Sequence, residues 1–147
     1  MPTWNEFAAA APDLAAFGAR RLLGRVSYLA TLRSDGSPRV HPVTVHIGTD
    51  QLFVYMEPTS PKAHDLIRDS RYAIHCSVED DEGGQGEFMM RGTARLVDDP
   101  KRRAALFEAA RVAGFHPQDR HLVFEFGVEH ALSTIYEDGK PKRKRYG

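Results

Sequence analysis

Ser60 and Lys62 flank a proline at the point where an apolar strand pattern passes into a helical one. Serine is a common N-cap residue, and Pro61 suits the first helical turn because its missing N–H is not needed there. A helix N-terminus presents unpaired N–H groups and the positive end of the helix dipole, to which the hydroxyl and the ammonium add. The triplet therefore predicts a phosphate site. Taken alone, it also fits a serine that only caps and a lysine that is only solvated.

Two predicted strands and a helix position this site. The strands cover Arg39–Ile47 and Leu52–Met56, and the Gly-containing link 48–51 between them suits an antiparallel hairpin. The helix covers 62–69, where Ala63, Leu66 and Ile67 share one face. A strand thus leads directly into the N-terminus of a helix.

The rest of the chain is predicted to be mainly β. Further strands are expected at Arg25–Arg33, Arg71–Val78, Gln85–Val97, His121–Val128 and Ala131–Tyr136. Helices are expected within residues 1–24 and from Asp98 to Gly114. Six or seven strands with few helices must bury their sheet against itself, which predicts a β-barrel or sandwich with flanking helices in one domain, 1–147.

Composition narrows the function classes. Twenty basic and twenty acidic residues balance over 147 positions, so no overall field attracts nucleic acid or an anionic membrane. The single cysteine, Cys76, forms no intrachain disulfide, and no long apolar run or signal peptide is visible. We expect a cytoplasmic protein that binds neither nucleic acid nor membrane.

Histidines do not predict a metal site. His41 and His46 lie five residues apart in one strand, so their side chains point to opposite faces, about 16–17 Å apart along it. The other histidines are scattered, without the spacing of metal ligands. No metal is expected.

The C-terminal segment Lys140–Gly147 has five basic residues among eight. We interpret it as a solvated basic tail, with an electrostatic clamp for an anionic ligand or partner as the alternative. Nucleic-acid binding is disfavoured because the total charge is neutral and no aromatic residues are interleaved with the basic ones.

Three segments together resemble one known family. They are ATLRSDGSPRVHPV at Ala30–Val43, the run Leu52–Cys76 that contains the S-x-K motif, and FMMRGTARLV at Phe88–Val97. In order and spacing the sequence resembles the pyridoxamine 5′-phosphate oxidase-like superfamily of split β-barrel flavoproteins over residues 20–130. The resemblance implies an FMN-binding split barrel that forms a homodimer, with two flavin sites in the interface clefts.

The resemblance also implies cofactor contacts at eleven positions. One strand that borders the flavin ring and ribityl-phosphate corresponds to Arg39, Val40, His41 and Pro42. The strand that runs under the cofactor corresponds to Tyr55, Met56 and Glu57. Ser60 and Lys62 correspond to the family's phosphate ligands. Gln85 and Phe88 correspond to residues that approach the flavin ring from the partner chain. No catalytic residue is assigned.

One departure from the family limits the implied activity. True pyridoxamine phosphate oxidases hold pyridoxal phosphate with a C-terminal Arg and His, whereas this chain ends in KPKRKRYG. The resemblance therefore implies a flavin-type oxidoreductase that passes hydride or electrons to a small organic acceptor, with a nicotinamide as candidate donor. Coenzyme F420 is an alternative to FMN, because its polyglutamate tail could meet Lys142–Arg145. A non-catalytic carrier of FMN or heme, with His41 or His130 as a heme ligand, is the third reading.

Overall fold

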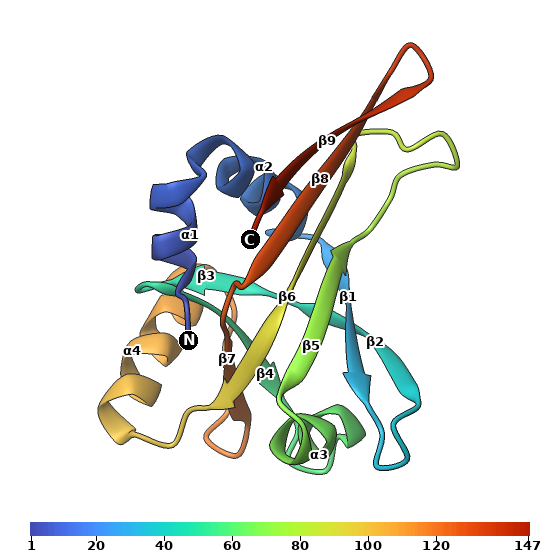
Figure 1. The fold of residues 1–147 in the computed structure, drawn as a ribbon. Coiled ribbons are helices and arrows are strands. Elements are labelled where there is room, and N and C mark those ends of the chain that lie inside the picture. The colour runs from blue at the N-terminus through green and yellow to red at the C-terminus, as the bar shows by residue number, and fades with distance from the viewer.

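The computed structural model describes all residues from Met1 to Gly147 and shows one curled antiparallel sheet with helices at its ends (Figure 1). The strands are β1 (Val26–Leu32), β2 (Pro38–Thr44), β3 (His46–Gly48), β4 (Gln51–Met56), β5 (Arg71–Cys76), β6 (Glu87–Leu96), β7 (Leu122–Phe126), β8 (His130–Glu137) and β9 (Lys140–Tyr146). The helices are α1 (Trp4–Ala10), α2 (Pro12–Leu22), α3 (Pro61–Arg68) and α4 (Pro100–Val112). The strands run in the order β2-β1-β5-β6-β7-β4-β3, and β8 and β9 branch from β6.

Strand β6 divides the sheet into two parts. Its first half, 87–91, pairs with β8, and its last residues, 94–96, pair with β7. Its other edge pairs with β5. Because β6 exchanges partners at Gly92, the sheet curls into a split barrel rather than a flat layer. The predicted split β-barrel with flanking helices is confirmed.

Close packing explains why a glycine occupies the exchange point. A Cβ on Gly92 would overlap the carbonyl oxygen of Gly127, which follows β7. That carbonyl accepts a hydrogen bond from the Tyr72 hydroxyl at 2.7 Å, and the Gly127 N–H donates to the Thr93 carbonyl at 2.9 Å. The backbone turn after β7 therefore lies directly on β6.

The core has two parts, which lie on the two faces of β4. Leu52, Val54 and Met56 point into the barrel, whose fully buried residues include Leu29, Ile74, Met90, Phe124 and Phe126. Phe53 points outward into a smaller cluster with Val97, Leu106, Ala110 and Val123 beneath α4. Both faces of β4 are covered, which explains its uninterrupted apolar sequence.

The N-terminal helices lie where the sequence predicts them. Thr3 and Glu6 form a reciprocal capping box at the start of α1. On α2, Leu14 and Leu22 are buried in the barrel core. No helix of this chain has both the length and the apolar character needed to cross a bilayer.

Two predictions about the strands are wrong. The expected strand Arg39–Ile47 is divided into β2 and β3, so nine strands form rather than six or seven. The expected solvated tail, Lys140–Gly147, is instead strand β9, paired along its length with β8. Asp138 and Gly139 have φ of 52° and 74°, the positive values that a tight two-residue hairpin requires. The Asp-Gly pair therefore turns the chain back into the sheet.

Candidate functional site

Ser60 and Lys62 lie at the start of α3, as predicted. Ser60 is buried and occupies the N-cap position, and Pro61 begins the helix. The Ser60 side chain makes no capping hydrogen bond; its oxygen instead accepts from the Lys62 ammonium at 2.9 Å. The expectation that the Ser60 side chain caps the helix is therefore wrong.

Lys62 is a half-buried ammonium without a carboxylate partner. Its hydrogen bond to Ser60 is a contact with a neutral group. Burial lowers the pKa of Lys62, because it removes water from the charged amine. A charge in this state is stabilised by an anion that takes the place of the lost water. This is the strongest indication of an anion site in the molecule.

Arg39 is held beside α3 by a buried carboxylate. The Arg39 Nε donates to Asp65 Oδ2 at 2.6 Å, and the Thr31 hydroxyl donates to the same oxygen at 2.8 Å. Arg68 donates to the other oxygen at 2.9 Å. Burial alone would raise the pKa of Asp65, but the hydrogen bonds from Arg39, Thr31 and Arg68 lower it below its usual value.

We predict an acid-sensitive contribution of Asp65 to stability. Asp65→Asn loses charged hydrogen bonds and should lower the free energy of unfolding by about 2 kcal/mol near pH 7. Because the folded pKa of Asp65 is lowered, this contribution is present above about pH 4 and is lost as the pH falls through the folded value. Urea unfolding at several pH values should show the two proteins converging in acid. Exposed Asp81→Asn is the control, and a difference that persists in acid would contradict the assignment.

Strand β2 presents different residues on its two faces. His41 lies on the side of Arg39, and its pKa is lowered first by burial and then by the charges of Lys62 and Arg39. Val40 and Pro42 point to the opposite, outer face and are exposed. This alternation places Arg39 and His41 together near Lys62.

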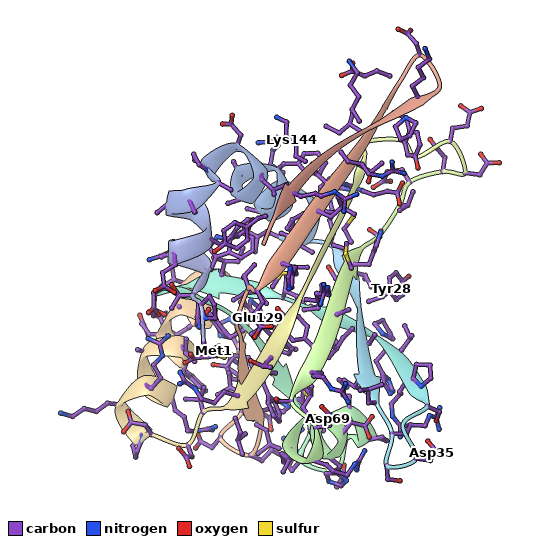
Figure 2. The ribbon with its side chains drawn as sticks, viewed as in Figure 1. Met1, Tyr28, Asp35, Asp69, Glu129 and Lys144 are labelled. Carbon is purple, nitrogen blue, oxygen red and sulfur yellow. The ribbon has the colours of Figure 1, made fainter.

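A polar cleft of about 460 Å³ adjoins the start of α3. It is lined by Arg33, Ser34, Asp35, Arg39, Pro61, His64, Asp65 and Arg68. Figure 2 shows the turn that carries Asp35 and the end of α3 that carries Asp69 at the same end of the sheet. Three arginines against two aspartates make the cleft cationic.

Sequence reasoning missed Asp65, Arg33, His64 and Arg68 in this cleft. The three-residue spacing of Asp65 and Arg68 on a helix was a visible signal for their ion pair. The link from Asp65 to Arg39 joins residues 26 positions apart. It depends on how α3 packs against the sheet, which no local pattern reveals.

The side chains of β4 and its end do not join the cluster of Arg39, Ser60 and Lys62. Tyr55 stacks on Phe115 with ring centroids 5.7 Å apart, on the α4 side of the strand. Met56 is 3% exposed in the barrel core. Glu57 is exposed and pairs with Arg120 at 2.7 Å, and a hydrogen bond from Arg120, with a second from His121, lowers its pKa to about 2. Its charge is matched within its own chain.

The two residues expected to reach the cofactor of a partner chain differ in exposure. Phe88 is fully buried, and a Cβ at Gly18 of α2 would lie 2.5 Å from its ring. Its side chain therefore cannot contact a partner's ligand, which corrects that expectation. Gln85 is exposed, and its side-chain oxygen accepts from Arg21 at 3.2 Å. Gln85 precedes β6 and Phe88 is its second residue. This end of β6 lies away from α3 (Figure 1).

Comparison with known proteins decides the family. Residues 23–135 match the family model described as pyridoxamine 5′-phosphate oxidase. The chain belongs to this family. The matched segment covers β1 to β7 and most of β8, and it includes Arg39, Ser60 and Lys62. A comparison with curated proteins gave no match.

Solved structures of the family's split-barrel fold resemble this chain. PhzG from Burkholderia lata, in complex with tetrahydrophenazine-1-carboxylic acid, is 16% identical with a TM-score of 0.66, over 99% of this chain and 87% of that one. A NimC/NimA family protein from Clostridium acetobutylicum is 18% identical with a TM-score of 0.63, over 97% and 92%. A heme-binding protein from Mycobacterium smegmatis is 19% identical with a TM-score of 0.65, over 88% and 57%. This chain thus spans little more than half of the heme-binding protein, and identities this low establish the fold alone.

Proposed function

We propose that this chain is one half of a homodimeric oxidoreductase that binds FMN through the phosphate site at the start of α3. The observation that carries the proposal is the half-buried Lys62 ammonium, which has a serine hydroxyl beside it and no carboxylate partner. When bound, FMN supplies hydride and electron transfer, here to a small organic acceptor with a nicotinamide as candidate donor. The chain's own residues bind and orient it.

The residues present fit the phosphate of FMN. Lys62 offers a charge, Ser60 a hydroxyl, and Arg39 guanidinium N–H groups beyond the Nε that Asp65 engages. His41 adds a ring nitrogen near these charges. We assign Lys62 and Ser60 as phosphate ligands and Arg39 as their support, while the backbone of β2 from Val40 to Pro42 borders the ring.

The other residues of the implied site enter the proposal in different ways. Tyr55 and Met56 contribute their strand backbone, because their side chains pack elsewhere. Glu57 is left out, since Arg120 and His121 already match its charge. Gln85 is kept as a contact from the partner chain, and Phe88 is left out because its ring is buried.

The cationic cleft keeps coenzyme F420 as a second candidate. Arg33 and Arg68 line this cleft beside Arg39, so a ligand with further anionic groups could extend from the phosphate site into it. The sequence favours F420 as an alternative because its polyglutamate tail could contact Lys142–Arg145. Within one chain those residues lie at the far end of the sheet from α3 (Figure 1). The arginine cleft therefore replaces them as the support for this candidate.

An exposed apolar face supports the homodimer. Val40 is 63% exposed, Val26 48% and Tyr28 45%, on the outer face of β1 and β2. Tyr28 lies opposite Pro42 of β2, so apolar side chains continue across the strands. Figure 2 shows Tyr28 pointing away from the sheet on that side. A contiguous apolar surface of this kind is typical of an interface, and we propose that a second copy covers it.

A spectroscopic titration tests the proposed function. The purified full chain is titrated separately with FMN, F420 and heme, and absorbance and fluorescence are followed. We expect saturable uptake of FMN, and then its reduction by NAD(P)H with turnover of a quinone or enone. Uptake of F420 with none of FMN would favour the second candidate. A Soret band without flavin uptake would indicate a heme carrier, and no uptake at all would overturn the proposal.

The dimer face is tested by Tyr28→Glu. A charge at the centre of an apolar interface has to be buried without a partner, so dimerisation should weaken at least tenfold. Sedimentation velocity over a concentration series measures the change. Val112→Glu, at a 75% exposed position on α4, is the matched control. If Tyr28→Glu sediments like the wild-type dimer, the interface lies elsewhere.

A further inference from the structure

Arg21, in the last turn of α2, holds both ends of the loop that joins β5 to β6. The loop covers residues 77–86 and leaves the sheet at the end where α2 packs against β6 (Figure 1). The Arg21 side chain is buried, and it donates to the Ser77 carbonyl at 2.6 Å and to the Gly86 carbonyl at 3.3 Å. A third bond, from Nη1, goes to the side-chain oxygen of Gln85 at 3.2 Å. One guanidinium therefore binds the start and the end of the loop together with an exposed side chain.

Gln85 has a backbone conformation that residues other than glycine rarely adopt. Its φ is 67°, in the left-handed region. The next residue, Gly86, has φ of 79° and is closely packed: a Cβ there would lie 2.9 Å from the Phe17 ring and 3.2 Å from the Thr134 carbonyl oxygen. The packing of Gly86 and the bond from Arg21 together fix Gln85. Strained backbone that is fixed by its surroundings occurs most often at functional sites.

The bond from Arg21 decides which way the Gln85 amide faces. A guanidinium has N–H donors and no acceptor, so the amide must turn its oxygen toward Arg21. Its NH2 group then points away from Arg21. Gln85 is exposed, and its NH2 group donates to no other group of the chain. The side chain therefore presents two N–H donors to a group outside its own chain.

The charge of the loop indicates what kind of group this is. Residues 79–82 are all acidic and exposed. Glu79 is also the carboxylate next to Arg21, with Oε1 3.8 Å from Nη1, and it pairs with Arg25. A negative loop of this kind disfavours a phosphate or carboxylate beside the Gln85 amide. The carbonyl oxygens and ring nitrogens of a flavin are neutral acceptors, and hydrogen bonds to them tune the cofactor.

We propose that Arg21 is a positioning residue of the flavin site, which orients Gln85 so that its NH2 group donates to a carbonyl oxygen or ring nitrogen of the flavin bound by the partner subunit. This inference rests on the proposed function, in which Gln85 reaches the cofactor of the other chain. A purely structural role for Arg21 needs its bonds to the Ser77 and Gly86 carbonyls. That role does not account for the third bond, to an exposed amide.

The first test is Gln85→Glu, which preserves the shape of the side chain. The carboxylate still accepts from Arg21, so the loop keeps its anchor, but no N–H donor remains. Fluorescence titration of the full chain with FMN and with riboflavin measures the affinity. We expect both ligands to bind about tenfold more weakly, because a hydrogen bond is lost and a negative charge faces an acceptor. Equal loss for both ligands places the contact on the ring, since riboflavin has no phosphate.

Two further variants separate the lost donor from the added charge. Gln85→Leu removes the amide without adding a charge and should weaken both ligands by about fivefold. Gln118→Glu is the matched control. Gln118 is also exposed, and its side-chain oxygen also accepts from an arginine, Arg120. This control adds the same charge in the loop after α4 and should leave both affinities unchanged.

A double-mutant cycle tests the positioning role of Arg21. Arg21→Lys keeps the charge, but one ammonium cannot hold three groups in place, so the Gln85 amide is free to turn. Flavin affinity should fall by about the same factor as in Gln85→Leu. The double variant should show no further loss, because Arg21 acts through Gln85. Additive losses would show that Arg21 acts by holding the loop, which overturns its assigned role. Circular dichroism checks that each variant is folded.

The outcomes separate this inference from the proposed function. If the wild type binds FMN and Gln85→Glu binds it equally well, the inference fails and the proposed function stands. A loss of affinity for FMN without a loss for riboflavin would overturn the ring contact. If the wild type binds neither ligand, the proposed function fails, and this inference fails with it.

Discussion

Lys62→Ala is expected to lower the affinity for FMN by about ten- to a hundredfold. A hydrogen bond between charged partners is worth about 1.5–3 kcal/mol, and Lys62 is the ammonium without a carboxylate at the proposed phosphate site. Equilibrium titration followed by flavin fluorescence measures the loss. Riboflavin, which lacks the phosphate, should bind the wild type and the variant with the same affinity.

The thermal stability of the cofactor-free protein distinguishes binding from structure. Burial lowers the pKa of Lys62, so folding disfavours its charged form, and removing the amine should leave Tm unchanged or slightly raised. Exposed Lys101→Ala is the control for a general loss of charge. An unchanged FMN affinity in Lys62→Ala would show that the phosphate binds elsewhere.

Gly92→Ala should be the most destabilising single methyl addition in the barrel. The new Cβ would overlap the Gly127 carbonyl oxygen, which is backbone and cannot rotate away. Relief requires the turn after β7 to move off β6, which weakens the hydrogen bonds of Gly127 to Tyr72 and Thr93. We expect a loss of about 3 kcal/mol, since overpacking costs about 1–3 kcal/mol and hydrogen bonds are lost as well. In a chain of this size, Tm should fall by about 10 °C.

Differential scanning calorimetry at one fixed protein concentration measures this effect, because dimerisation makes Tm depend on concentration. Gly36→Ala is the matched control: the position has φ of 85° and nothing within 4 Å of the added Cβ. It should lose about 1 kcal/mol from backbone strain alone. If the two variants lose equal stability, contact with Gly127 does not determine the residue at position 92.

The sequence predicted the parts of this structure that depend on local patterns. The strand predicted to begin at Arg39 contains most of β2, whose pleat puts Arg39 and His41 on one face and Val40 on the other. Pro61 marked the start of α3. These signals arise from strand pleat and helix entry, which neighbouring residues determine.

The sequence did not predict the features that depend on packing between residues far apart in the chain. Strand β9 was missed because its side chains are charged on both faces and show no apolar alternation. The side chains of Tyr55 and Met56 could not be oriented, since α4 covers the outer face of β4 and makes both faces apolar. Asp65 was missed because its partner Arg39 comes from another element. Each depends on contacts across the chain rather than along it.

The change of pairing partners along β6 determines which amide hydrogens are protected until the whole sheet unfolds. Because β5 lies on one side of this strand and β7 and β8 share the other, its central amide hydrogens can reach solvent only when both parts of the sheet separate. Those amides should exchange with deuterium at the rate of global unfolding, whereas the outer amides of β9 exchange through local fraying. The β8–β9 hairpin can therefore open and close without disturbing the barrel.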